Sequence, residues 1–171
     1  PDCEITLEAN PGTFERERFR AFRAAGVTRL SIGVQSFHDP SLRAIGRVHD
    51  AAQARAAVAA AAMAFDSFNI DLMYALPGQS LQMALLDVER ALALQPTHMS
   101  HYQLTLEPNT VFAARPPAGI PDEDGAWDMQ DDCQALLAKA GFTQYEVSAY
   151  AREGRQCAHN LNYWRFGDYL G

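Results

Sequence analysis

Cysteine is scarce in this sequence, and the few cysteines that it has are far apart. Cys3, Cys133 and Cys157 are the three cysteines among 171 residues, and no CxxC or CxxxCxxC spacing occurs. The sequence therefore offers no preformed metal cage, and its cysteine content is too low for a secreted disulfide scaffold. This favours a reducing compartment, and we predict a cytoplasmic protein.

An excess of basic residues is also absent. The formal net charge of −7 argues against broad electrostatic attraction to nucleic acid or to anionic membranes. We find no signal peptide, and the alanine-rich stretch at 51–64 is too short to cross a bilayer. Phosphate-binding loops of the GxGxxG or GxxxxGK kind are missing, as is a GxSxG nucleophile elbow.

The sequence does contain a regular alternation of strand-like and helical runs. The expected strands lie at 4–9, 29–34, 67–74 and 99–106. Asp50 and Ser80 are expected helix N-caps, Pro40 suits the first turn of a short helix, and Gly26 suits a left-handed helix end. The pattern predicts a parallel sheet with helices outside, either a barrel or a doubly wound fold.

The pattern changes after Glu107. A proline-rich crossing is followed by a predicted helix at 124–140 and a predicted strand at 142–150. The tail at 152–171 is interpreted as a loop or as the edge of an appended region. We therefore divide the chain into βα units at 1–107 and a C-terminal α+β region at 108–171.

Polar residues fall where a parallel barrel binds its ligands, at the C-terminal ends of strands. Glu8, Gln35 and Asp71 lie near the ends of three predicted strands, and Arg47 follows the second. The carboxylates suit an ammonium group and ribose hydroxyls, Gln35 suits a hydroxyl, and Arg47 suits an α-carboxylate. The set could bind an amino acid joined to a ribose. The alternative is a structural role, with Glu8 paired to Arg47 and Asp71 bonded to a loop.

A second group of candidates is the run HNLNYWRF at 159–166. His159 could ligate a heme iron while Tyr163 and Trp164 cover the porphyrin face. Alternatively, the rings pack this segment onto the sheet and His159 is a surface histidine. His98 and His101 have no evident third metal ligand nearby, so we interpret them as structural.

Several motifs occur together in one order. EITLEANP at 4–11, LSIGVQSF at 30–37, FNIDLMYALPGQ at 68–79 and YQLTLEPNT at 102–110 resemble consecutive motifs of one family. That family is the radical S-adenosylmethionine (SAM) proteins related to oxygen-independent coproporphyrinogen III oxidase. HNLNYW at 159–164 is similar to the heme-binding signature of its heme chaperone branch.

The resemblance implies a fold and a set of ligand contacts. The fold is a partial parallel (β/α) barrel of the radical SAM type, with four barrel strands in this chain, followed by the start of a C-terminal α+β region. SAM contacts are implied at Glu8, Gln35, Arg47, Asp71 and Thr105. Heme contacts are implied at His159, Asn160, Tyr163 and Trp164.

The family's cluster motif, CxxxCxxC, does not occur in this sequence. We expect it upstream in a longer parent protein, which would bind a 4Fe-4S cluster and SAM. This chain is then an internal fragment without metal ligands of its own, and alone it is expected not to cleave SAM.

The functional hypothesis is a fragment of a heme chaperone that binds heme and delivers it to heme-dependent proteins. Expected partners are heme and, by transient contact, heme acceptors such as membrane respiratory enzymes; neither nucleic acid nor a membrane span is expected. The alternative is oxygen-independent coproporphyrinogen III dehydrogenase, which oxidatively decarboxylates two propionates in heme biosynthesis. The chaperone hypothesis does not require the parent protein to be an enzyme, whereas the dehydrogenase hypothesis does, and the sequence leaves both possible.

Overall fold

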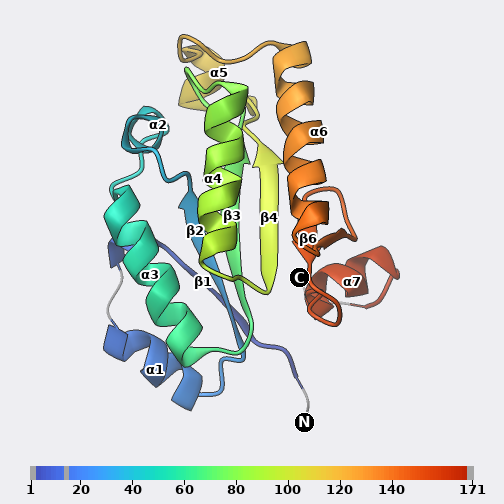
Figure 1. Ribbon diagram of the computed structural model, residues 1–171. Helices are drawn as coiled ribbons and strands as arrows, with labels where there is room; N and C mark the ends of the chain where they lie inside the picture. The colour runs from blue at the N-terminus through green and yellow to red at the C-terminus, as the bar shows by residue number, and fades with distance from the viewer. Residues whose placement is uncertain (1–2, 14–15, 169–171) are drawn as a thin grey trace.

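One six-stranded sheet organises the protein, in a computed structural model that describes residues 3–13 and 16–168 (Figure 1). The strands are β1 (Thr6–Ala9), β2 (Arg29–Gln35), β3 (Phe68–Tyr74), β4 (His98–Gln103), β5 (Thr143–Gln144) and β6 (Ala149–Ala151). Their order across the sheet is β1-β2-β3-β4-β6-β5. The first four pair in parallel, whereas β6 runs antiparallel to β4 and to β5. The four predicted parallel strands are confirmed.

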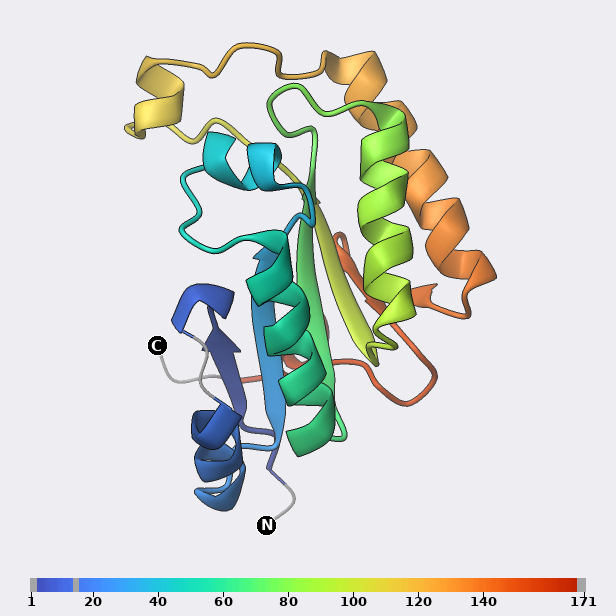
Figure 2. The ribbon, with the colours of Figure 1, turned by 60° about the vertical axis from the view of Figure 1, so that its left-hand side comes forward.

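Helices connect and cover the strands. They are α1 (Arg16–Ala24), α2 (Asp39–Ala44), α3 (Ala51–Ala64), α4 (Leu81–Ala93), α5 (Val111–Ala114), α6 (Glu123–Lys139) and α7 (Ala158–Trp164), with a 3-10 turn at Pro11–Thr13. In Figures 1 and 2, α3, α4 and α6 stand side by side across one face of the sheet. Among the described residues, no helix combines the length and the apolar character needed to cross a membrane.

The hydrophobic core lies between the sheet and these helices. Leu30, Ile32, Ile70 and Leu72 alternate along β2 and β3 and are fully buried, as is Val58 of α3. Because successive side chains of a strand point to opposite faces, the residues between them face the other side of the sheet. The apolar side chains of each strand therefore pack against the helices. The polar side chains lie on the opposite face of the sheet, where a ligand could bind.

Local signals set several helix boundaries as predicted. The Asp50 side chain accepts the Gln53 N–H, and the Gln53 side chain accepts the Asp50 N–H, which makes a capping box. Ser80 accepts the Met83 N–H at the start of α4. Gly26 has φ 105°, the left-handed conformation expected after α1.

The C-terminal third differs from the prediction in two places. The single strand predicted at 142–150 is wrong, because the segment reverses between β5 and β6. The Glu146 carboxylate holds this turn by accepting from the N–H and the hydroxyl of Ser148. The loop predicted for 152–171 is also wrong in part, since α7 forms there. The division at 107/108 stays a prediction; β5 and β6 of the second part join the sheet of the first.

Candidate functional site

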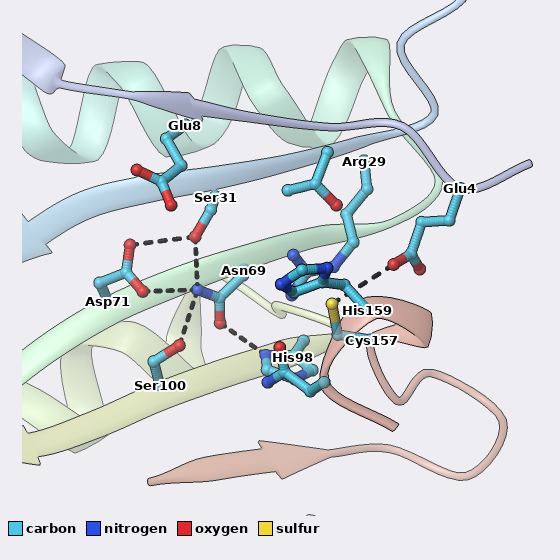
Figure 3. A pocket seen from close by; sticks show the side chains of 12 residues that line it. Glu4, Glu8, Arg29, Ser31, Asn69, Asp71, His98, Ser100, Cys157 and His159 are labelled. Carbon is cyan, nitrogen blue, oxygen red and sulfur yellow. Dashed lines mark hydrogen bonds between the residues drawn. The ribbon is translucent and has the colours of Figure 1, made fainter. Parts of the chain in front are cut away.

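The face of the sheet opposite α3, α4 and α6 carries polar side chains (Figure 3). Strand register places Glu8 beside Ser31, Ser31 beside Asn69, and Asp71 beside Ser100. Residues paired across neighbouring strands point to the same side. The period-two alternation of β2, β3 and β4 therefore gathers these polar groups in one place, where they line two adjoining cavities.

The upper cavity lies toward the carboxyl ends of the parallel strands and measures about 380 Å³. Its lining residues are Glu8, Ala9, Asn10, Ser31, Gly33, Gln35, Arg47, Asp71 and Tyr102. The structure thus brings together Glu8, Gln35, Arg47 and Asp71, which come from β1, β2, the loop after α2 and β3. The sequence had suggested that Asp71 lies at the end of its strand. In the structure it lies in the middle of β3.

Gln35 adopts an unusual backbone conformation at the end of β2. Its φ of 68° lies in the left-handed region, which costs a residue with a side chain roughly 1–2 kcal/mol. The register between β2 and β3 shifts between Ile32 and Gln35. The result is a buried amide whose Oε1 accepts the Tyr102 hydroxyl at 2.8 Å. Strain of this kind is concentrated at ligand sites, where it fixes the direction of a side chain.

Gly33 provides room for that amide. A Cβ at this position would lie 3.1 Å from Nε2 of Gln35 and 3.4 Å from Oδ1 of Asn10. The same Asn10 Oδ1 accepts a hydrogen bond from Nη1 of Arg47 at 3.1 Å. The cavity thus combines nitrogen donors on Gln35 and Arg47 with carboxylate acceptors on Glu8 and Asp71. This donor and acceptor set fits a zwitterionic amino acid joined to a ribose.

Asp71 is the desolvated carboxylate of the site. Burial raises its pKa, while hydrogen bonds from Ser100, Ser31 and Asn69 and the charge of Arg29 oppose the rise. Ser31 Oγ lies 3.1 Å from Oδ2 of Asp71, and Asn69 Nδ2 lies 2.7 Å from Oδ1. A ligand that brings a positive charge or donating hydroxyls would therefore stabilise the ionised form.

Thr105 lies apart from the other four predicted SAM contacts. Its hydroxyl donates to Oε1 of Glu107 at 2.8 Å. It lines a separate shallow cavity with Glu107, Thr110, Val111 and Phe112.

The lower cavity lies toward the amino ends of the strands and measures about 420 Å³. Its lining residues are Glu4, Thr6, Glu8, Arg29, Ser31, Asn69, Asp71, His98, Ser100, Cys157, His159 and Asn160 (Figure 3). It shares Glu8, Ser31 and Asp71 with the upper cavity. Arg29 is only 5% exposed, and its Nε has no hydrogen-bond partner.

Helix α7 closes one side of the lower cavity. His159 and Asn160 line the cavity, whereas Tyr163 and Trp164 are 46% and 54% exposed and do not. The rings of His159 and Tyr163 meet edge to face with centroids 4.9 Å apart. The structure therefore brings two of the four predicted heme contacts to the cavity and leaves two aromatic rings on the surface beside it.

The described residues contain no group of three His, Cys, Asp or Glu side chains able to bind a metal ion. The three cysteines are free, and burial, the largest cause, raises the pKa of Cys133 to about 12. His98 faces the lower cavity, while His101 packs against Tyr74 with ring centroids 4.7 Å apart.

Sequence reasoning missed several residues of both cavities. They are Asn10, Arg29, Ser31, Gly33, Asn69, Ser100 and Tyr102. A signal was present, because Arg29, Ser31, Asn69 and Ser100 sit at alternate positions of strands that also carry an apolar alternation. Residues in register with Asp71 on the neighbouring strands point to the same face of the sheet, and this rule would have identified them.

Comparison with known proteins identifies the family. Residues 1–91 match the Radical SAM superfamily. The chain belongs to the radical SAM superfamily. The matched segment spans β1 to β3 and includes Glu8, Gln35, Arg47 and Asp71 of the upper cavity.

Curated relatives of this radical SAM chain carry names that mention heme. It is 56% identical over 170 residues to the heme chaperone HemW of Haemophilus influenzae, covering 99% of this chain and 44% of that protein. It is 56% identical over 171 residues to the heme chaperone HemW of Escherichia coli, covering 99% of this chain and 45% of that protein. The chain thus spans less than half the length of these relatives.

A solved structure supports the predicted fold. The radical SAM enzyme coproporphyrinogen III oxidase (HemN) of Escherichia coli matches with a TM-score of 0.81 and 28% sequence identity. The match covers 96% of this chain and 38% of that one. The prediction of a partial parallel barrel of the radical SAM type is confirmed.

Proposed function

We propose that this chain forms part of a radical SAM heme chaperone, which binds heme and delivers it to heme-dependent proteins. The observation that carries the proposal is the position of α7. This helix places His159 at the lower cavity and leaves the rings of Tyr163 and Trp164 exposed beside it. An imidazole is a common axial ligand of heme iron, and flat apolar rings suit a porphyrin face. The names of the HemW relatives support the same function.

The upper cavity is proposed to hold SAM. Arg47 would meet the α-carboxylate, Glu8 and Asp71 the ammonium group and ribose hydroxyls, and Gln35 a further hydroxyl. Thr105 is retained as a contact from the segment after β4. A 4Fe-4S cluster, bound elsewhere in the complete protein, would supply electrons to SAM.

Asn160, Tyr163 and Trp164 complete the proposed heme contacts. Asn160 is half-buried, and its Nδ2 donates to the hydroxyl of Tyr145 at 3.3 Å, so it would hold the start of α7 in place. Tyr163 and Trp164 would cover the porphyrin. We further propose a cytoplasmic protein that contacts heme acceptors, including membrane respiratory enzymes, transiently.

Heme titration of the complete protein tests the proposal. Addition of heme is expected to produce a shifted Soret band that weakens in His159→Ala, because the variant lacks the iron ligand. Gln156→Ala is the matched control, since Gln156 is exposed and lies just before α7, and its spectrum should equal that of the parent. No Soret shift in the parent, or equal shifts in the parent and His159→Ala, would contradict the proposed heme site.

The structural likeness to coproporphyrinogen III oxidase favours a second candidate function, the oxidative decarboxylation of coproporphyrinogen. The complete protein with its cluster, SAM and a reductant should be supplied with coproporphyrinogen III. Formation of protoporphyrinogen would favour this dehydrogenase, and no product together with heme binding would favour the chaperone.

A further inference from the structure

A chain of hydrogen bonds crosses the sheet between α7 and Asp71. Its first member is Tyr145, which follows β5. The Tyr145 hydroxyl oxygen accepts the backbone N–H of Cys157 at 3.1 Å and Nδ2 of Asn160 at 3.3 Å. A tyrosine hydroxyl has a single proton. Tyr145 therefore donates that proton to its remaining partner, Nε2 of His98, at 2.6 Å.

The protonation of His98 follows from this bond. Since Nε2 accepts, Nδ1 carries the ring proton and donates to Oδ1 of Asn69 at 2.7 Å. The ring is neutral, in agreement with burial and the charge of Arg29, which lower its pKa to about 3. The rings of Tyr145 and His98 also meet edge to face, with centroids 5.5 Å apart.

Asn69 links His98 to Asp71, because its side-chain amide accepts a hydrogen bond from one and donates a hydrogen bond to the other. Because Oδ1 accepts from His98, Nδ2 donates, and it does so to Oδ1 of Asp71 at 2.7 Å and to Oγ of Ser31 at 2.8 Å. Ser31 then donates to the other carboxylate oxygen of Asp71. Asp71 lines both cavities. From Tyr145 to Asp71, each bond of the chain is donated toward the carboxylate, and a side branch runs from Nδ2 of Asn69 to Oγ of Ser100 at 3.0 Å.

We propose that Tyr145, His98 and Asn69 are positioning residues that couple a nucleoside ligand at Asp71 to tetrapyrrole binding at α7. This inference rests on the proposed function. The element with two states is the first turn of α7, which is either docked on Tyr145 or released. The backbone N–H of Ala158 also donates to Oε1 of Glu4 at 2.9 Å, so the turn is held by polar contacts from other segments and not by an N-cap side chain.

The sign of the coupling follows from the order that the first ligand gives to the turn. A ligand that holds the Asp71 carboxylate in place fixes the Asn69 amide, and the amide fixes His98 and Tyr145 in turn. The docked turn is then ordered before the tetrapyrrole arrives, so the second ligand loses less conformational entropy on binding. Each ligand therefore raises the affinity for the other by the same factor.

The experiment is heme titration of the complete protein with and without SAM, in the absence of reductant. SAM is expected to tighten heme binding about five-fold, at the low end of usual coupling factors. Tyr145→Phe keeps the ring and removes the hydroxyl, so heme should still bind while the factor falls to about one. Tyr150→Phe is the matched control, because the Tyr150 hydroxyl bonds to Gln134 on the helix side of the sheet and the factor should be unchanged.

Each outcome bears on a different claim. A full coupling factor in Tyr145→Phe overturns the hydrogen-bond chain while leaving the heme site intact. If that variant does not fold, the parent protein alone decides, since heme must raise SAM affinity by the factor by which SAM raises heme affinity. A factor of one in both directions overturns the coupling. Absence of heme binding in the parent overturns the proposed function, and this inference with it.

Discussion

The hydroxyl of Tyr102 on β4 donates a 2.8 Å hydrogen bond to Oε1 of Gln35 at the end of β2. The same pair of residue types occurs on the opposite face of the sheet, where Tyr74 donates to Oε1 of Gln130 in α6 at 3.0 Å. One pair lines the upper cavity and the other joins the sheet to a helix. Removing one hydroxyl should therefore affect ligand binding, whereas removing the other should affect only the stability of the fold.

Tyr102→Phe is expected to weaken SAM binding about ten-fold, equivalent to about 1.4 kcal/mol. The variant leaves Oε1 of buried Gln35 without its donor, so the amide loses its fixed direction. Calorimetric titration of the complete protein measures the effect. Tyr74→Phe should lose comparable thermal stability but keep SAM affinity. Equal losses of affinity in the two variants would count against the upper cavity as the SAM site.

Gly33→Ala should also weaken SAM binding about ten-fold. The new Cβ would lie 3.1 Å from Nε2 of Gln35 and would push the amide from its place over Gly33. Gly125→Ala is a control with an equally close contact, 3.1 Å from Oδ1 of Asp122, at the start of α6. Its SAM affinity should match that of the parent, and a Gly33→Ala protein with parental affinity would show that the cavity is not used.

Asp71→Asn should remove a loss of stability that the parent protein undergoes as pH rises from 4 to 7, and it should weaken SAM binding. Burial raises the pKa of Asp71 in the folded state. The native protein therefore holds this proton at pH values where the unfolded chain, with a carboxyl pKa of about 3.9, has released it. The free energy of unfolding therefore decreases as pH rises from about 3.9 to the raised pKa of Asp71. The variant has no carboxyl group at this position, so its stability should not show this decrease.

Melting curves between pH 4 and pH 7, recorded without ligand, check the stability effect of Asp71→Asn. Asp87→Asn is the matched control, because burial also raises the pKa of Asp87, which bonds to Ser36 and Phe37 away from both cavities. That variant should retain SAM affinity. A parental pH dependence of the melting temperature in Asp71→Asn would contradict the predicted destabilising charge.

The two tryptophans of the chain report separately on heme. Trp164 lies on α7 and Trp127 on α6, and both are largely exposed. Heme bound at α7 should quench the emission of Trp164 and have little effect on that of Trp127. The difference in emission between the complete protein and its Trp164→Phe or Trp127→Phe variant isolates each contribution. Stronger quenching of Trp127 would place heme elsewhere.

The βα order could be predicted from the sequence because local signals agree with the tertiary structure. Asp50 and Ser80 cap their helices, and Gly26 ends one, through contacts within a few residues of the chain. Four of the nine residues that line the upper cavity were found by position and by family resemblance, and the structure gathers them. Their ligand stays a prediction.

Helix α7 could not be predicted because its support is not local. Cys157 makes no side-chain cap bond, and Asn160 and Asn162 are poor helix formers. The helix is held instead by Glu4 and Tyr145, which are distant in the sequence. The turn between β5 and β6 was missed for a related reason: the carboxylate of Glu146 closes it without the Gly or Asn-Gly that usually marks a hairpin.

The bond between Glu4 and Ala158 spans 154 positions of the chain. Contacts of such long range form slowly, because a large loop must close before the bond contributes anything. During synthesis, α7 would therefore be among the last elements to settle, after the parallel strands have assembled. Heme added to a refolding protein should bind with the slowest kinetic phase and not with the early formation of the helices on the sheet.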